Sequence, residues 1–275
     1  MNFAIFGGDN RSLRLCALLR ADGHGVTPFA LERVMPDCVS DPAEALHGAD
    51  GVILPLPCDR NGLLNAPFSA ESHTFPQLLA AAPPGLPVLA GKTSENLRAV
   101  CRRQKLALSD YFLREDFTLR NAALTAEGAV SLLLTGENAL CGSRVLITGF
   151  GRIGRMLAGK LRALGASVTV GARKSEDRAL AEALGCQAIS LSCAVEGTWD
   201  AVVNTIPAQI FDRSAIQAFG EARCIELASA PYGFDLEAAA ALEKQIELAP
   251  GLPGKTAPLA AAAAVRDAIY GILEG

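Results

Sequence analysis

Short apolar runs alternate with segments of helical periodicity along the first part of the chain. The apolar runs predict strands at residues 2–6, 25–30, 51–54, 87–90 and 107–109. Segments with apolar positions three and four residues apart predict helices at residues 11–21, 42–46 and 94–104. Residues 58–76 are rich in turn-forming residues, so we expect a long surface loop there. Such alternation predicts a parallel sheet with helices on both faces.

The alternation begins again after a long helical segment at residues 116–134. Strands are predicted at residues 144–148, 167–171, 188–190, 201–204, 223–227 and 247–248. Helices are predicted at residues 154–164, 177–184, 215–218, 236–244 and 256–273. The second half therefore repeats the α/β pattern of the first, with the long helix between them.

A glycine-rich turn follows the first strand of the second half and opens a helix. Its residues are Gly149, Phe150, Gly151, Arg152, Ile153 and Gly154. Gly149 permits a tight turn, Gly151 lets the backbone approach a pyrophosphate, and Gly154 lets the helix pack closely on the strand. Free N–H groups at the helix N-terminus favour the phosphates. We therefore predict that these six residues bind a dinucleotide in a Rossmann domain.

The end of the next strand indicates which dinucleotide binds. Enzymes that use NAD usually carry Asp or Glu there, but this chain carries Ala172, Arg173 and Lys174. Arg173 can bind a 2′-phosphate through two hydrogen bonds, so we predict NADP(H); the alternative is that both cations belong to a solvated loop. Strand 201–204 ends in a further segment that we expect beside the cofactor, where Thr205 and Pro207 flank the nicotinamide ribose. Its residues are Asn204, Thr205, Ile206 and Pro207.

These patterns define the expected fold. It is α/β, with two doubly wound parallel-sheet domains joined by a long helix, the C-terminal one a Rossmann dinucleotide-binding domain. We expect an N-terminal substrate or partner domain, an inter-domain helix, the Rossmann domain, and a closing helix that can pack back on the N-terminal domain. The expected ranges are residues 1–115, 116–136, 137–256 and 257–275.

Composition narrows the functional classes. Half of the residues are hydrophobic, the net charge is −4 and no strongly basic block occurs, so we expect no nucleic-acid partner. The N-terminus lacks the charge and length of a signal peptide, and no apolar run is long enough to span a bilayer. We therefore expect a cytoplasmic protein. The eight cysteines are scattered without Cys-x-x-Cys spacing, so we predict reduced thiols and no metal site.

Several segments resemble one family along nearly the whole chain. They are Phe6-Gly-Gly-Asp-Asn-Arg11, Leu54-Pro-Leu-Pro57, Asp110-Tyr-Phe-Leu-Arg-Glu-Asp-Phe117, Asn121, Thr125-Ala-Glu-Gly128, the glycine turn, Val170-Gly-Ala-Arg-Lys174, Asn204-Thr-Ile-Pro207 and Leu248-Ala-Pro-Gly-Leu-Pro-Gly-Lys-Thr-Ala-Pro258. The chain resembles the dipicolinate synthase A-subunit family. One departure is Glu226, where the family tends to have Asp before Leu-Ala-Ser, so the reach of this carboxylate is in question.

The resemblance implies a function. The family makes dipicolinate (pyridine-2,6-dicarboxylate) in the mother cell during endospore formation, on a branch from lysine biosynthesis. The implied reaction is NADP-dependent oxidation of dihydrodipicolinate or hydroxytetrahydrodipicolinate. The implied partners are a small dicarboxylate substrate and the flavoprotein-like B-subunit of dipicolinate synthase, and assembly into a homo-oligomer is also open.

A flat ring with two carboxylates needs cationic or N–H donors at two ends of its site. The candidate substrate-binding residues are Lys92, Arg114, Arg120, Gly254 and Lys255, the last two in a turn that we expect to form an anion site. The candidate catalytic residues are Tyr111, Asp116, Glu127 and Lys255, the first three as general bases, although a structural role is the stronger expectation for each base.

Two alternatives remain beside the dehydrogenase. One is an NADPH-binding subunit that regulates the synthase without turnover, and the other is an NADP-dependent dehydrogenase of another small cyclic acid. A standard hydroxyacid dehydrogenase mechanism is disfavoured because it uses a C-terminal acid–base histidine. The three histidines here all lie among the first 73 residues.

Overall fold

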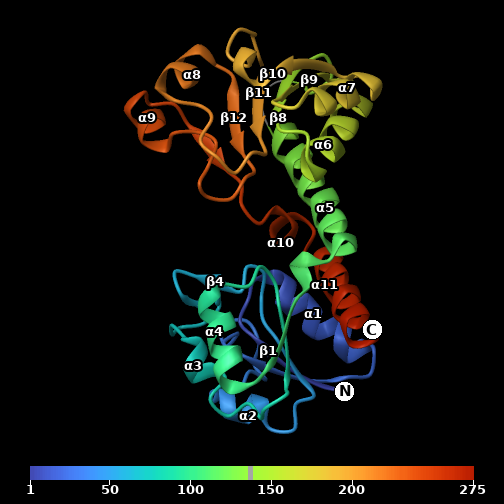
Figure 1. Cartoon of the computed structure of the whole chain (residues 1–275), viewed down its shortest axis with the longest axis vertical. Coiled ribbons are helices and arrows are strands. Elements are labelled where there is room, and N and C mark those ends of the chain that lie inside the picture. The colour runs from blue at the N-terminus through green and yellow to red at the C-terminus, as the bar shows by residue number, and fades with distance from the viewer. Residues whose placement is uncertain (136–138) are drawn as a thin grey trace. The chain divides into compact units, whose positions relative to one another are not determined.

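The computed structural model describes residues 1–135 and 139–275. The chain forms two compact units: the first combines Met1–Asn121 with Gly254–Gly275, and the second is Ala122–Pro253. Each unit is an α/β domain built on one parallel sheet (Figure 1), which confirms the predicted fold class. The prediction placed the corresponding boundaries after residues 115 and 256.

The first unit contains a five-stranded parallel sheet of order β2-β1-β3-β6-β7. Its strands are β1 (Asn2–Phe6), β2 (Gly25–Phe29), β3 (Gly51–Ile53), β6 (Pro87–Ala90) and β7 (Ala107–Asp110). Its helices are α1 (Asn10–Ala21), α2 (Pro42–Leu46), α3 (Phe75–Leu78), α4 (Glu95–Gln104), η1 (Tyr111–Leu113) and α11 (Pro258–Leu273). Each parallel strand leads into the next through a helix or loop, so all strand carboxyl ends lie at one edge.

The side chains of β1 point alternately into two separate hydrophobic cores. Phe3 and Ile5 pack on one face with apolar side chains of α1 and α11. Ala4 and Phe6 face the opposite core, which α2, α3 and α4 cover. Figure 1 shows α1 and α11 side by side, and this pairing makes the last helix part of the first unit.

The second unit contains a six-stranded parallel sheet of order β10-β9-β8-β11-β12-β13. Its strands are β8 (Arg144–Thr148), β9 (Ser167–Ala172), β10 (Gln187–Ser190), β11 (Ala201–Asn204), β12 (Arg223–Glu226) and β13 (Ile246–Leu248). Its helices are α6 (Arg152–Ala163), α7 (Ser175–Ala183), η2 (Leu191–Cys193), α8 (Arg213–Ala218) and α9 (Leu236–Ala241). Val145 and Ile147 of β8 face α6, whereas Leu146 faces the core of α8 and α9.

The chain passes between the units twice. The long predicted helix is α5 (Glu115–Leu134), and the return segment contains α10 (Leu252–Thr256). No helix in the described part of the chain has the length and apolar character needed to cross a membrane.

Two local predictions were wrong. The loop expected at residues 58–76 contains a hairpin, β4 (Asp59–Arg60) with β5 (Leu63–Leu64), and the start of α3. Two-residue strands are too short to show alternation, so the pattern gave no signal for them. The turn expected around Gly254 is helical, because α10 begins at Leu252 and includes both Pro253 and Gly254.

Candidate functional site

The glycine turn has the geometry that a pyrophosphate requires. Gly149 follows β8 with a φ of +89°, in the left-handed region that favours glycine. A Cβ built on Gly154 would lie 2.2 Å from the carbonyl oxygen of Gly149, so only glycine permits this approach of helix and turn. At Gly151, the N-cap of α6, a Cβ would meet no atom within 4 Å. The backbone at the α6 N-terminus is therefore open to a ligand, and the residues present fit a dinucleotide.

The segment after β11 lies directly against this turn, because β11 pairs with β8. The Thr205 hydroxyl donates to the Thr148 carbonyl oxygen at 2.8 Å. A Cβ on Gly149 would lie 2.6 Å from Thr205 Oγ1 and 2.9 Å from Ile206 Cγ1. The structure therefore brings Thr205 and Ile206 beside the glycine turn, while Pro207 follows them at the surface.

A buried polar network fixes the ends of β8, β11 and β12. Asn204 accepts from the Thr148 hydroxyl at 2.8 Å and donates to Glu226 Oε1 at 2.7 Å. Glu226 also accepts from the backbone N–H groups of Ala228 at 2.9 Å and Gly233 at 2.7 Å. Burial raises the pKa of Glu226, although these hydrogen bonds oppose the shift. The Glu226 side chain, one methylene longer than aspartate, thus reaches both Asn204 and the loop that follows β12.

The loop between β9 and α7 carries two exposed cations. Within the described residues, neither the Arg173 nor the Lys174 side chain takes part in a hydrogen bond or ion pair. Arg178 holds the loop by donating to the carbonyl oxygens of Ala172 at 2.9 Å and Arg173 at 2.8 Å. This support leaves both cations available to a ligand at the carboxyl end of β9.

Arg155 connects the two loops of this edge. Its Nε donates to the Phe150 carbonyl oxygen at 2.7 Å, and its Nη2 lies 3.1 Å from Asp177 of α7. Its guanidinium also lies 5.7 Å from the centre of the Phe150 ring. Sequence reasoning assigned no role to Arg155 or Arg178, because only the fold places their side chains on these backbone carbonyls.

The three predicted bases have structural partners. Tyr111 is buried, its hydroxyl donates to the Leu54 carbonyl oxygen at 3.1 Å, and burial raises its pKa, so its surroundings disfavour a role as base. Asp116 forms an ion pair with Arg114 at 3.1 Å. Glu127 pairs with Lys160 at 3.0 Å. Asp116 and Glu127 are exposed, and they belong to different units.

The predicted substrate-binding residues occupy different local settings. Lys92 is exposed after β6, and its backbone N–H donates to Asp110 Oδ1 at 3.0 Å. Arg120 pairs with Asp267 of α11. Lys255 is exposed on α10, whereas Gly254 is buried, and a Cβ on it would lie 2.7 Å from Asp9 Oδ2.

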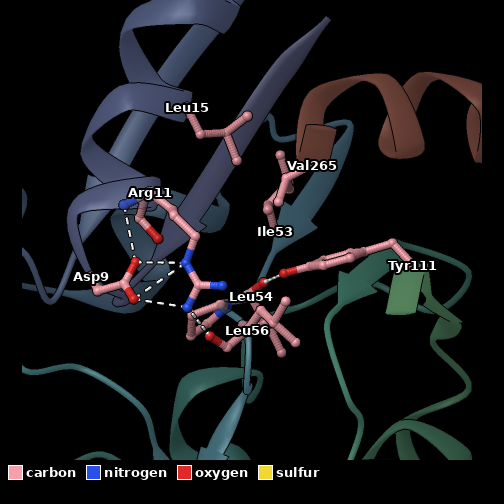
Figure 2. A pocket seen from close by; sticks show the side chains of 10 residues that line it. Asp9, Arg11, Leu15, Ile53, Leu54, Leu56, Tyr111 and Val265 are labelled. Carbon is pink, nitrogen blue, oxygen red and sulfur yellow. Dashed lines mark hydrogen bonds and ion pairs between the residues drawn. The ribbon is translucent and has the colours of Figure 1, made fainter. Parts of the chain in front are cut away.

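Asp9 and Arg11 form an ion pair that the sequence analysis did not anticipate. Arg11 Nη2 lies 2.8 Å from Asp9 Oδ2, and the pair lines a pocket of the first unit (Figure 2). In the sequence, both residues belong to the Gly-Gly-Asp-Asn-Arg turn after the first strand. That pattern alone indicates only a structural or substrate-side turn. In the described residues, no group of three or more His, Cys, Asp or Glu side chains is placed to hold a metal ion.

Comparisons with known proteins agree with this two-part architecture. Residues 2–112 match the N-terminal domain of the dipicolinate synthase A-subunit, and residues 120–220 match the NAD-binding domain of D-isomer specific 2-hydroxyacid dehydrogenases. The dipicolinate synthase A-subunit of Bacillus subtilis is 29% identical, with 94% of this chain and 91% of that protein covered.

Two solved structures resemble the chain over its whole length. The dipicolinate synthase A-subunit of Bacillus halodurans has a TM-score of 0.85 at 26% identity, covering 100% of this chain and 98% of that one. Its Bacillus subtilis counterpart has a TM-score of 0.83 at 27% identity, covering 100% and 96%. Together with the glycine turn and its flanking loops, these matches show that the chain is similar along its whole length to dipicolinate synthase A-subunits and carries a dehydrogenase-type domain of the kind that binds a nicotinamide dinucleotide.

Proposed function

We propose that the chain is the NADP-dependent dehydrogenase subunit of a dipicolinate synthase. It oxidises dihydrodipicolinate, or hydroxytetrahydrodipicolinate after loss of water, to dipicolinate in the mother-cell cytoplasm during endospore formation. The observation that carries the choice of cofactor is the pair of exposed cations, Arg173 and Lys174, in place of a carboxylate at the end of β9.

The bound cofactor would accept a hydride from the ring carbon of the substrate. The backbone N–H groups that follow Gly149, at the N-terminus of α6, would bind its pyrophosphate. Arg173 would bind the 2′-phosphate by two charge-assisted hydrogen bonds, and Thr205 and Pro207 would hold the nicotinamide ribose.

The reaction demands little acid–base help from the protein. Oxidation of dihydrodipicolinate releases one hydride and one proton and forms an aromatic ring, so the product is strongly favoured. Orientation and a modest proton acceptor are then sufficient. The exposed carboxylates of Asp116 and Glu127 are the candidates for that acceptor. Lys255 is the candidate contact for a substrate carboxylate.

Turnover by the purified chain tests the proposal directly. The chain is incubated with dihydrodipicolinate and either NADP+ or NAD+, with and without the flavoprotein-like B-subunit. We expect growth of the reduced-cofactor absorbance with NADP+, and its dependence on the B-subunit reports whether that partner is required. Binding of NADP(H) without turnover in every mixture would instead favour a regulatory role. Turnover of another cyclic acid, with none of dihydrodipicolinate, would favour a different dehydrogenase.

A further inference from the structure

A small pocket lies at the carboxyl edge of the first sheet, and the proposed cofactor contacts do not use it. Its walls come from the start of α1, from the segment after β3 and from α11, and include Leu54 and Val265 (Figure 2). Its open part takes a group about the size of one water molecule or one carboxylate oxygen. The pocket therefore suits one end of a small ligand rather than a whole ring.

Arg11 is held rigidly at this pocket with one nitrogen left over. Its Nε donates to Asp9 Oδ1 at 2.9 Å, and its Nη2 donates to Asp9 Oδ2 at 2.8 Å and to the Leu56 carbonyl oxygen. Figure 2 shows the guanidinium between Asp9 and the segment of Leu54 and Leu56. Among the described residues, Nη1 donates to no acceptor, although the side chain is only 9% exposed. A guanidinium carries donors on every nitrogen, so Nη1 offers two N–H groups in a fixed direction.

Ser12 supplies a second unused donor beside Arg11. The residue lines the same pocket and is 7% exposed, yet its hydroxyl has no hydrogen-bond partner within the described residues. A Cβ on Gly8 would lie 1.9 Å from Ser12 Oγ, so the glycine leaves the space that this hydroxyl occupies. Among the described residues, neither Arg11 Nη1 nor Ser12 Oγ is a fully buried atom without a partner, so both donors are open to the pocket and available to a ligand that accepts hydrogen bonds.

The local charge favours an anion. Burial acts to raise the pKa of Asp9, but its hydrogen bonds and charge attraction to Arg11 outweigh burial, and the pKa lies below its usual value. The positive charge of Arg60 also acts on Asp9. Arg60 is not among the residues that line the pocket, so the Arg11 guanidinium is the cation that a carboxylate would meet there.

We propose that Arg11 Nη1 and the Ser12 hydroxyl bind one carboxylate group of the substrate acid. This inference rests on the proposed function for the identity of the acid, a cyclic dicarboxylate. The ring itself lies outside the pocket, with the carboxylate inserted between the two donors. Asp9 is the positioning residue, because it fixes the guanidinium through two hydrogen bonds.

Binding of pyridine-2,6-dicarboxylate to the full chain tests the proposal, by calorimetric titration with and without saturating NADP+. The variants are Arg11→Lys and Ser12→Ala, and the matched control is Arg14→Lys, an exposed arginine on the same helix. We expect Arg11→Lys to weaken binding by about tenfold or more and Ser12→Ala by about fivefold, with Arg14→Lys unchanged. Circular dichroism verifies that each variant is folded, and Ser12→Ala alone decides the matter if Arg11→Lys does not fold.

The outcomes separate this pocket from the rest of the proposed function. Wild-type affinity in Ser12→Ala and in a folded Arg11→Lys, or no binding to the wild-type chain in either titration, would overturn the carboxylate site. An equal loss of NADP(H) affinity in the variants would overturn it as well, because the residues would then serve the cofactor. Selective loss of dicarboxylate binding supports the site even if the chain fails to oxidise dihydrodipicolinate, so the two proposals fail independently.

Discussion

The side-chain amide of Asn204 donates a 2.7 Å hydrogen bond to the carboxylate of Glu226, and neither side chain is exposed to solvent. The bond joins the carboxyl ends of two neighbouring strands, β11 and β12. It thereby fixes the loop after β11, in which Thr205 lies on the glycine turn. A polar contact inside the sheet thus helps to shape the surface that receives the cofactor.

We expect Glu226→Gln to lower the free energy of unfolding by about 1–3 kcal/mol. The carboxylate accepts on both oxygens, from Asn204 on one and from the Gly233 N–H at 2.7 Å on the other. A glutamine must present its NH₂ group to one of these donors, which leaves a buried donor unpaired. Urea denaturation followed by circular dichroism measures the loss. Glu221→Gln, on an exposed residue, is the matched control, and equal stability of both variants would contradict the role of the network.

Two glycines of helix α6, Gly154 and Gly159, differ in the space that an added methyl group would have. Gly154→Ala places a Cβ 2.2 Å from the Gly149 carbonyl oxygen, so the turn must shift away from the phosphates. We expect NADP(H) affinity to fall by about tenfold or more, measured by fluorescence titration. Gly159→Ala lies on the same helix, where a Cβ meets no atom within 4 Å. It should retain affinity and stabilise the helix by about 0.5–1 kcal/mol; weakened binding in both variants would count against the close approach as the cause.

The nucleotide turn could be predicted from sequence because its cause is local. Glycines at fixed spacing between an apolar strand and a helix indicate where the backbone can come close to a phosphate. The network of Asn204 and Glu226 joins residues 22 positions apart and depends on which strands become neighbours. The hydrogen bond from Arg11 to the Leu56 carbonyl oxygen joins residues 45 positions apart, and the pattern of residues along the sequence does not indicate such a contact. The sequence could therefore locate the cofactor turn, but not the side chains that hold its neighbours in place.

Replacement of Arg173 tests the preference for the phosphorylated cofactor. Arg173→Ala removes an exposed guanidinium beside the end of β9, and among the described residues it breaks no side-chain hydrogen bond or ion pair. We expect NADP(H) affinity to fall by about 10–100-fold and NAD(H) affinity to change by less than about twofold. Arg213→Ala, at an exposed site on the start of α8, is the control for loss of one positive charge. Equal losses for the two cofactors would assign Arg173 to a contact that both share.

Substitution of Tyr111 distinguishes a structural hydroxyl from a base. Loss of a general base lowers turnover by about 10²–10⁴-fold. The Tyr111 hydroxyl already donates to the Leu54 carbonyl oxygen, and its raised pKa keeps the phenol protonated near neutral pH, so it has no free base form to accept a proton from the substrate. We therefore expect Tyr111→Phe to keep turnover within about tenfold and to cost about 0.5–1.5 kcal/mol of stability. Steady-state rates and denaturation curves measure the two effects, and a rate loss beyond about 10²-fold would restore Tyr111 as the base.

The ion pair of Asp9 and Arg11 should make stability depend on acidity in a defined direction. Because the folded-state pKa of Asp9 lies below the ordinary value of 3.8, its contribution is present above 3.8 and is lost as the pH falls through the folded-state value. Asp9→Asn keeps the N-cap but leaves the Arg11 guanidinium, 9% exposed, without its carboxylate. We expect the variant to be less stable by about 1–3 kcal/mol near neutral pH.

The difference between wild type and Asp9→Asn should then narrow as the pH falls below 3.8, because protonation removes the same charge from the wild-type protein. Asp37→Asn is the control, since Asp37 pairs with Arg20 at the surface and its side chain is 48% exposed. Exposed pairs contribute about 0–1 kcal/mol, so this variant should remain close to wild type. Denaturation at a series of pH values measures both differences. A gap for Asp9→Asn that widens on acidification would show that the Asp9 carboxylate does not stabilise the fold through Arg11.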